Sequence, residues 1–178
     1  MLKTLRTIAS IGIVSEPAPP SDASLRLREA LQNDVLRVLG RALNIRHVDA
    51  GSCNGCELEL QALNNPLYNI EGLGIRFVAS PRHADLLLVT GPVSRHMVTA
   101  LRRTYDATPD PKLVVAIGDC GCDGGVFGES GASAGRVSNI IAVDVAVAGC
   151  PPTPERILQG ILTAIAPKSI AADSSRQT

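Results

Sequence analysis

Two short, continuous apolar runs constrain the fold of this chain more than any other feature of its sequence. Residues 86–89 read Leu-Leu-Leu-Val, and residues 114–117 read Val-Val-Ala-Ile. A strand that is apolar at every position has no face left for water, so such strands belong to parallel sheets covered by helices on both faces. Segments with helical spacing separate the apolar runs. The sequence therefore predicts an α/β fold with a mostly parallel sheet.

The expected elements alternate along the chain. Strands are expected over residues 47–49, 75–79, 85–90, 112–117 and 144–148, and helices over 25–42, 56–63, 94–105 and 153–164. The first helix follows a Pro-Ala-Pro-Pro stretch at residues 17–20, which can continue neither a helix nor a central strand. We therefore expect an N-terminal arm over residues 1–24, one α/β domain over 25–166 and a flexible tail over 167–178.

Composition excludes some classes of function. Basic and acidic residues balance at 17 each, only 2% of residues are aromatic and tryptophan is absent, so a nucleic-acid surface is not expected. No run approaches the roughly 18 apolar residues that span a bilayer. We expect a cytoplasmic chain, and in that compartment grouped cysteines are more often metal ligands than disulfides.

Four of the five cysteines are placed to form one site. Cys53 and Cys56 form a C-x-x-C motif after the first strand, while Cys120 and Cys150 each follow a later strand and a glycine. Because ligands of such folds sit beyond the carboxyl ends of the strands, these three loops are expected to converge at one sheet edge. Nearby glycines would let the backbone approach a bound group; they are Gly51, Gly55, Gly118, Gly121 and Gly149.

Three chemistries are open to such a set of cysteines. A 4Fe–4S cluster needs four thiolates, and a structural zinc ion also takes four. Zinc sites more often pair two close C-x-x-C motifs, so the wide spacing here favours iron and sulfur. A redox-active C-x-x-C would leave Cys120 and Cys150 without a role. The zinc and redox interpretations remain as alternatives.

Four segments of the chain together resemble a known family. They are Asp49 to Glu59 around the C-x-x-C motif, Ser80 to Gly91, Gly118 to Phe127 and Val143 to Pro154. They resemble the small, electron-transferring subunit of membrane-associated nickel–iron hydrogenases, above all the formate-hydrogenlyase type, and the related 20 kDa subunit of complex I. The resemblance implies a flavodoxin-like fold with one 4Fe–4S cluster, whose ligands would be Cys53, Cys56, Cys120 and Cys150.

The resemblance also implies partners and a location. Such a subunit catalyses no reaction itself, and relays electrons between the active site of a hydrogenase large subunit and a ferredoxin-like iron–sulfur subunit. It would reach membrane subunits only through the complex. We therefore expect a chain without a membrane span of its own, peripheral on the inner face of the cytoplasmic membrane.

Two details bear on the type of complex and on the ligand set. The complex I subunit typically has adjacent cysteines in the first motif, whereas Asn54 and Gly55 separate the cysteines here. The spacing thus resembles the hydrogenase branch, with a quinone-linked subunit as the alternative. The family motif places a ligand directly after Gly-Asp, which selects Cys120 and leaves Cys122 as a free thiol.

Several charged residues near these motifs have two interpretations each. Glu57 and Glu59 would favourably meet the dipole of the helix that they begin, or serve proton movement or subunit contact. For a second group, Arg82, His83 and Asp85, the resemblance implies an interface or a structural turn, and capping of the neighbouring helix and strand is the alternative. His47 and His96 are expected to be packing or surface histidines.

Overall fold

The computed structural model of the chain describes residues 41–174, with side chains as far as Ala166, and four single residues nearer the N-terminus. The expected arm lies outside the described residues, apart from Arg6 and Ser10. Most of the helix expected over 25–42 also lies outside them, and Arg41 and Ala42 at its expected end are not helical. The division into arm, domain and tail stays a prediction.

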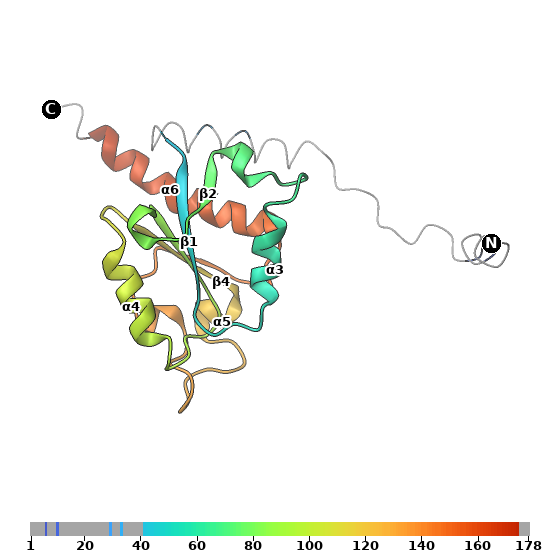
Figure 1. Cartoon of the computed structure of the whole chain (residues 1–178), viewed down its shortest axis with the longest axis vertical. Coiled ribbons are helices and arrows are strands. Elements are labelled where there is room, and N and C mark those ends of the chain that lie inside the picture. The colour runs from blue at the N-terminus through green and yellow to red at the C-terminus, as the bar shows by residue number, and fades with distance from the viewer. Residues whose placement is uncertain (1–5, 7–9, 11–28, 30–32, 34–40, 175–178) are drawn as a thin grey trace.

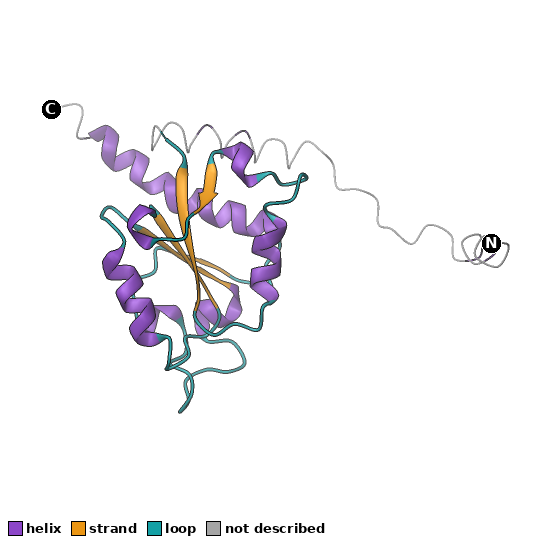
Figure 2. Cartoon of the chain, in the orientation of Figure 1, coloured by secondary structure: helices purple, strands orange, loops and turns teal. Residues whose placement is uncertain are grey.

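Five strands, all paired in parallel, form the sheet. Figures 1 and 2 show how the sheet lies among the helices. The strands are β1 (Leu43–Asp49), β2 (Ile75–Phe77), β3 (Leu86–Thr90), β4 (Leu113–Ile117) and β5 (Val145–Val147). Their order across the sheet is β2-β1-β3-β4-β5. This is the strand order of flavodoxin-like folds, so the predicted fold class is confirmed.

Helices cover both faces of the sheet (Figure 2). The helices are α3 (Gly55–Ala62), α4 (Val98–Ala107), α5 (Gly118–Asp123) and α6 (Pro154–Ser174), with short 3-10 turns η1 (Ile70–Leu73), η2 (Pro81–His83) and η3 (Val137–Asn139). α3 and α6 pack on one face, while α4 and η3 pack on the other. Of the helices in the described part of the chain, none is both long and apolar enough to cross a membrane.

The apolar run of β3 explains this layering. Leu86 and Leu88 pack into the core beneath α3 and α6, whereas Leu87 and Val89 pack beneath α4. All four side chains are fully buried. Burying each of them stabilises the fold by roughly 1.5–3 kcal/mol relative to leaving it exposed. The continuous run of apolar residues is therefore what the two-sided packing requires.

Some predicted boundaries were wrong for identifiable reasons. β1 begins at Leu43 rather than at residue 47, because its first residues pair with β2 through Leu43 and Ile75. α4 begins at Val98 rather than at Ser94. The Ser94 N–H donates to the Ala50 carbonyl at 2.7 Å, outside any helix. α6 continues to Ser174, well beyond the expected end at residue 164.

Candidate metal centre

The carboxyl ends of four strands meet at one edge of the sheet, and the cysteines gather there. Cys53 follows β1, Cys150 follows β5, and Cys120 lies in α5, the short helix that directly follows β4. Together with Cys56 from α3, they line a single cavity of about 100 Å³. The expectation of three loops needs one correction, because Cys120 lies on a helix that the sequence pattern did not predict.

Glycines form the wall of this cavity where it faces the sheet. Gly118 has φ +84°, and a Cβ atom there would lie 2.7 Å from the Cys56 sulfur. Gly91 has φ +78°, and its Cβ would lie 2.4 Å from the Ser52 nitrogen. A side chain at either position would be strained, and at Gly91 it would also clash with the Ser52 backbone. Gly121 was expected to let the backbone approach the bound group, but it faces the Val89 carbonyl and the Val137 side chain instead.

Hydrogen bonds fix the turn that carries Cys53. The Asp49 Oδ1 atom accepts from the backbone N–H groups of Gly51 and Ser52, both at 2.8 Å. The Ser52 hydroxyl accepts from the Asn54 N–H at 3.2 Å and donates to the Glu57 carboxylate. This network ties the end of β1 to the first turn of α3, so that Cys53 and Cys56 keep a fixed spacing.

The thiols of this cavity influence one another's protonation. Burial raises the pKa of Cys56 to about 12, with smaller contributions from the charges of Glu57 and then of Cys53, Cys120 and Cys150. Burial, and then the charges of Cys150 and Cys53, also raise the pKa of Cys120. Four thiolates held this close repel one another, so a bound group must bring positive charge and displace protons.

Cys122 does not line the cavity that the other four cysteines share. It lines a different pocket, with Ser138 and residues 143–146, and its sulfur lies 3.8 Å from the Ala116 carbonyl oxygen. Burial, followed by the charges of Asp119 and Asp123, raises its pKa to about 11. The pocket that it lines, and not its pKa, separates Cys122 from the four cysteines of the shared cavity.

The donor set and the shape of the cavity fit a 4Fe–4S cluster. Four cysteine sulfurs are the ligands that such a cluster takes, and the glycine walls leave room for a group larger than one ion. Among the described side chains, no three or more His, Cys, Asp or Glu residues are grouped so as to hold a single metal ion.

Glu57 does more than meet a helix dipole. It is only 8% exposed, and its Oε1 atom lies 3.7 Å from His47 Nε2. His47 Nε2 is also within 2.9 Å of the Thr90 hydroxyl, and burial lowers the pKa of this histidine despite the nearby carboxylates. His96 is exposed, as expected of a surface histidine, and Glu59 is half-buried on α3.

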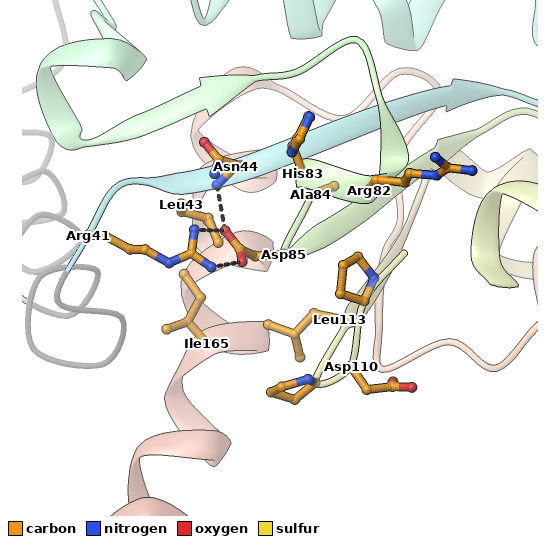
Figure 3. A pocket seen from close by; sticks show the side chains of 12 residues that line it. Arg41, Leu43, Asn44, Arg82, His83, Ala84, Asp85, Asp110, Leu113 and Ile165 are labelled. Atoms are coloured by element: carbon orange, nitrogen blue, oxygen red, sulfur yellow. Dashed lines mark hydrogen bonds and ion pairs between the residues drawn. The ribbon is translucent and has the colours of Figure 1, made fainter. Parts of the chain in front are cut away.

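The group of Arg82, His83 and Asp85 lies at the opposite end of the strands. The Arg41 guanidinium donates two hydrogen bonds to the Asp85 carboxylate, at 2.5 and 3.1 Å. Figure 3 shows this pair beside the cavity. The same carboxylate accepts from the Asn44 N–H at 3.0 Å. These bonds favour the structural-turn interpretation for Asp85. Arg82 and His83 are exposed beside a cavity of about 380 Å³.

Three residues of the cysteine cavity were not predicted. They are Ser52, Gly91 and Asp119. The Thr-Gly-Pro sequence directly after the apolar run of β3 could have pointed to Gly91, because strand ends face the site. Asp119 carries no such local signal, since its role depends on a segment about 30 residues away in the sequence.

Three curated proteins are similar in sequence to much of this chain. It is 48% identical over 129 residues to the probable membrane-bound hydrogenase subunit mbhJ of Pyrococcus furiosus, covering 72% of this chain and 77% of that protein. It is 41% identical to formate hydrogenlyase subunit 7 of Escherichia coli, covering 76% of this chain but 53% of that protein. It is 48% identical over 108 residues to an NADH-quinone oxidoreductase subunit of Herpetosiphon aurantiacus, covering 60% of each.

Two solved structures have the same fold. A chain of the archaeal membrane-bound sulfane sulfur reductase, a respiratory membrane complex, superposes with a TM-score of 0.64 at 32% identity, covering 78% of this chain and 75% of that one. A chain of an NAD+-reducing [NiFe]-hydrogenase superposes with a TM-score of 0.54 at 22% identity, covering 68% of this chain and 92% of that one. The second likeness shows the fold alone.

Residues 53–164, which contain all five cysteines, match the family described as NADH ubiquinone oxidoreductase, 20 Kd subunit. This stretch covers more than half of the chain. The resemblance drawn from the four sequence segments is therefore confirmed, and this protein belongs to the family of the complex I 20 kDa subunit and its hydrogenase relatives.

Proposed function

We propose that this chain is the electron-relay subunit of a membrane-associated nickel–iron hydrogenase complex of the formate-hydrogenlyase type. It would hold one 4Fe–4S cluster through Cys53, Cys56, Cys120 and Cys150. When bound, the cluster would supply one-electron transfer between the active site of the large subunit and a ferredoxin-like subunit. The observation that carries the proposal is the single cavity lined by these four thiols.

The chain's own residues would bind and orient this cluster. Cys56 and Cys120 are partly buried against the sheet edge, whereas Cys53 and Cys150 are exposed. The cavity thus has an inner side sheltered by Gly91 and Gly118 and an outer side that faces solvent. An outward-facing side lets a partner subunit approach closely, as transfer of electrons between subunits requires.

Exposed apolar side chains beside the cavity support docking of a partner there. Gly125 lies against the Cys120 sulfur, and the next two residues, Val126 and Phe127, are 98% and 62% exposed. Large apolar side chains exposed next to a functional site are typical of subunit contacts. We assign this contact to the hydrogenase large subunit. The assembled complex would attach the chain peripherally to the inner face of the cytoplasmic membrane.

A quinone-linked subunit of the complex I type is the second candidate. The sequence identity to the NADH-quinone oxidoreductase subunit equals that to the hydrogenase subunit, at 48% in both cases. The hydrogenase match is longer, however, at 129 against 108 residues. The two residues between Cys53 and Cys56 also resemble the hydrogenase branch. Both observations favour the hydrogenase assignment.

Metal analysis tests the cluster directly. The full chain, purified anaerobically, is expected to contain iron and acid-labile sulfide in equal amounts and to give a low-temperature EPR signal on reduction. Zinc in place of iron would favour the alternative, a non-enzymatic zinc module. A metal-free protein with a Cys53–Cys56 disulfide would instead favour a redox sensor. Either result would exclude the proposed cluster.

The activity of the native complex separates the two electron-transfer candidates. A complex purified through this subunit is expected to evolve hydrogen from a low-potential electron donor. Quinone reduction without hydrogen evolution would support the complex I type instead. Iron analysis of the same sample shows whether the cluster is present in either case.

A further inference from the structure

A pair of reciprocal hydrogen bonds joins the Cys120 helix to the Cys150 loop. The Asp119 N–H donates to the Gly149 carbonyl at 2.9 Å, and the Gly149 N–H donates to the Asp119 Oδ1 atom at 2.7 Å. Asp119 and Gly149 each directly precede a cysteine of the shared cavity, and both line that cavity themselves. The two bonds therefore act on the spacing of Cys120 and Cys150.

The sheet itself does not fix this spacing. The ladder between β4 and β5 ends at the pair Ile117 and Val147, so both cysteines lie beyond the last paired residues. Past that point the two bonds between Asp119 and Gly149 join the segments directly. A hydrogen bond from a backbone N–H to a carboxylate is stronger than one between neutral groups.

The same pair of strands carries a matching link at its other end. The Asp144 N–H donates to the Val114 carbonyl at 2.9 Å, and the Val114 N–H donates to the Asp144 Oδ2 atom at 2.7 Å. Both links have the same bond lengths and the same chemistry. They differ in position, because Asp144 precedes β5 and lies at the end of the strands that is away from the shared cavity.

We propose that Asp119 is a positioning residue, which holds Cys120 and Cys150 at the spacing that the cluster needs. This inference rests on the proposed function, because it assumes the four-cysteine cluster. Asp119 is not one of the four proposed ligands, and its Oδ1 atom accepts from the Gly149 N–H. Removing a residue that orients metal ligands typically weakens metal binding about 10- to 100-fold.

Three variants of the full chain test the inference: Asp119→Ala, Asp119→Asn and Asp144→Ala. The last is a matched control, because it removes an equivalent link from the same two strands. For each protein, the rate of iron loss to a chelator and the midpoint of thermal unfolding are measured. Asp119→Ala is expected to lose iron about 10- to 100-fold faster than wild type. Asp144→Ala is expected to keep the wild-type rate of iron loss, although its unfolding midpoint falls.

Asp119→Asn provides the rescue. Its amide oxygen can still accept from the Gly149 N–H, so we expect iron retention close to that of wild type. This variant also keeps the test decisive if Asp119→Ala does not fold. Equal iron loss from Asp119→Ala and Asp144→Ala, or failure of the Asn variant to retain iron, would overturn the inference. A wild-type chain without iron would instead overturn the proposed function.

Discussion

Gly118 and Cys56 are in such close contact that a Cβ atom on Gly118 would lie 2.7 Å from the Cys56 sulfur. The two residues come from different elements, since Gly118 begins α5 after β4 and Cys56 lies in α3. The φ angle of +84° at Gly118 is also one that other residues rarely adopt. This contact brings the C-x-x-C motif against the segment that carries Cys120.

Substituting this glycine should therefore displace a ligand. Gly118→Ala is expected to cost about 1–3 kcal/mol in backbone strain and to push Cys56 away from the cavity, which lowers iron content. Gly131→Ala is the control, because open space surrounds Gly131. Iron analysis and thermal unfolding measure both effects. Full iron content in Gly118→Ala would show that the contact has no part in ligand spacing.

The choice between the two neighbouring cysteines has a direct test. Cys120→Ser is expected to lose the cluster, because Cys120 lines the shared cavity. Cys122→Ser is expected to retain it, because Cys122 lines a separate pocket. Iron and sulfide contents, with EPR spectra of the reduced proteins, report the outcome. The reverse pattern would mean that Cys122 is the ligand.

Stability is expected to depend on pH through His47. Burial lowers the pKa of this histidine in the folded chain below its ordinary value of 6.5. Below pH 6.5 the unfolded chain therefore binds more protons, so the free energy of unfolding falls as the pH falls and is fully retained above 6.5. His47→Gln should flatten this dependence in denaturant titrations.

The control for this experiment is His96→Gln, because His96 is exposed. It should keep the wild-type dependence of stability on pH. If the free energy of unfolding changed equally with pH in wild type and in His47→Gln, a contribution from His47 would be ruled out.

Phe127 should matter for assembly and not for folding. Its side chain is 62% exposed, so Phe127→Ser is expected to change the free energy of unfolding by less than about 0.5 kcal/mol. If the large subunit covers Phe127, the same variant should weaken subunit association by at least about 1 kcal/mol. Leu67→Ser, at an equally exposed position after α3, is the control. Unchanged binding of Phe127→Ser in a titration with the large subunit would place the contact elsewhere.

The buried run of β3 should dominate stability. Leu88 is fully buried between β3 and the helices α3 and α6, so Leu88→Ala is expected to cost about 2–5 kcal/mol. Leu67→Ala, at an exposed position, should cost little. Chemical denaturation of both variants gives the comparison. A small loss of unfolding free energy in Leu88→Ala would mean that neighbouring core side chains fill the space that the leucine leaves.

The parallel sheet could be predicted because its central strands are apolar on both faces, a pattern that few other structures tolerate. The residues at which strands and helices begin and end were less predictable. Ser94 reads as a helix start, yet its N–H bonds to Ala50 on another segment. The short α5 was missed because Gly-Asp-Cys-Gly-Cys has weak helical propensity, and packing at the sheet edge supplies what propensity lacks.

The positions of Cys120 and Cys122 illustrate the same limit. The sequence motif favoured Cys120, but without a helix there was no geometric reason to separate two cysteines that lie two residues apart. In α5 residues at i and i+2 do not share a face, which places their sulfurs in different pockets. The link between Asp119 and Gly149 could not be predicted either, because it depends on how two distant segments meet.

The exposure of Cys53 and Cys150 has a practical consequence for handling this protein. A cluster held with two of its thiolates facing solvent can be reached by dissolved oxygen, which attacks iron–sulfur centres from their open side. Purified alone in air, the chain should therefore bleach within the preparation, and a bound partner over the cavity should slow that loss.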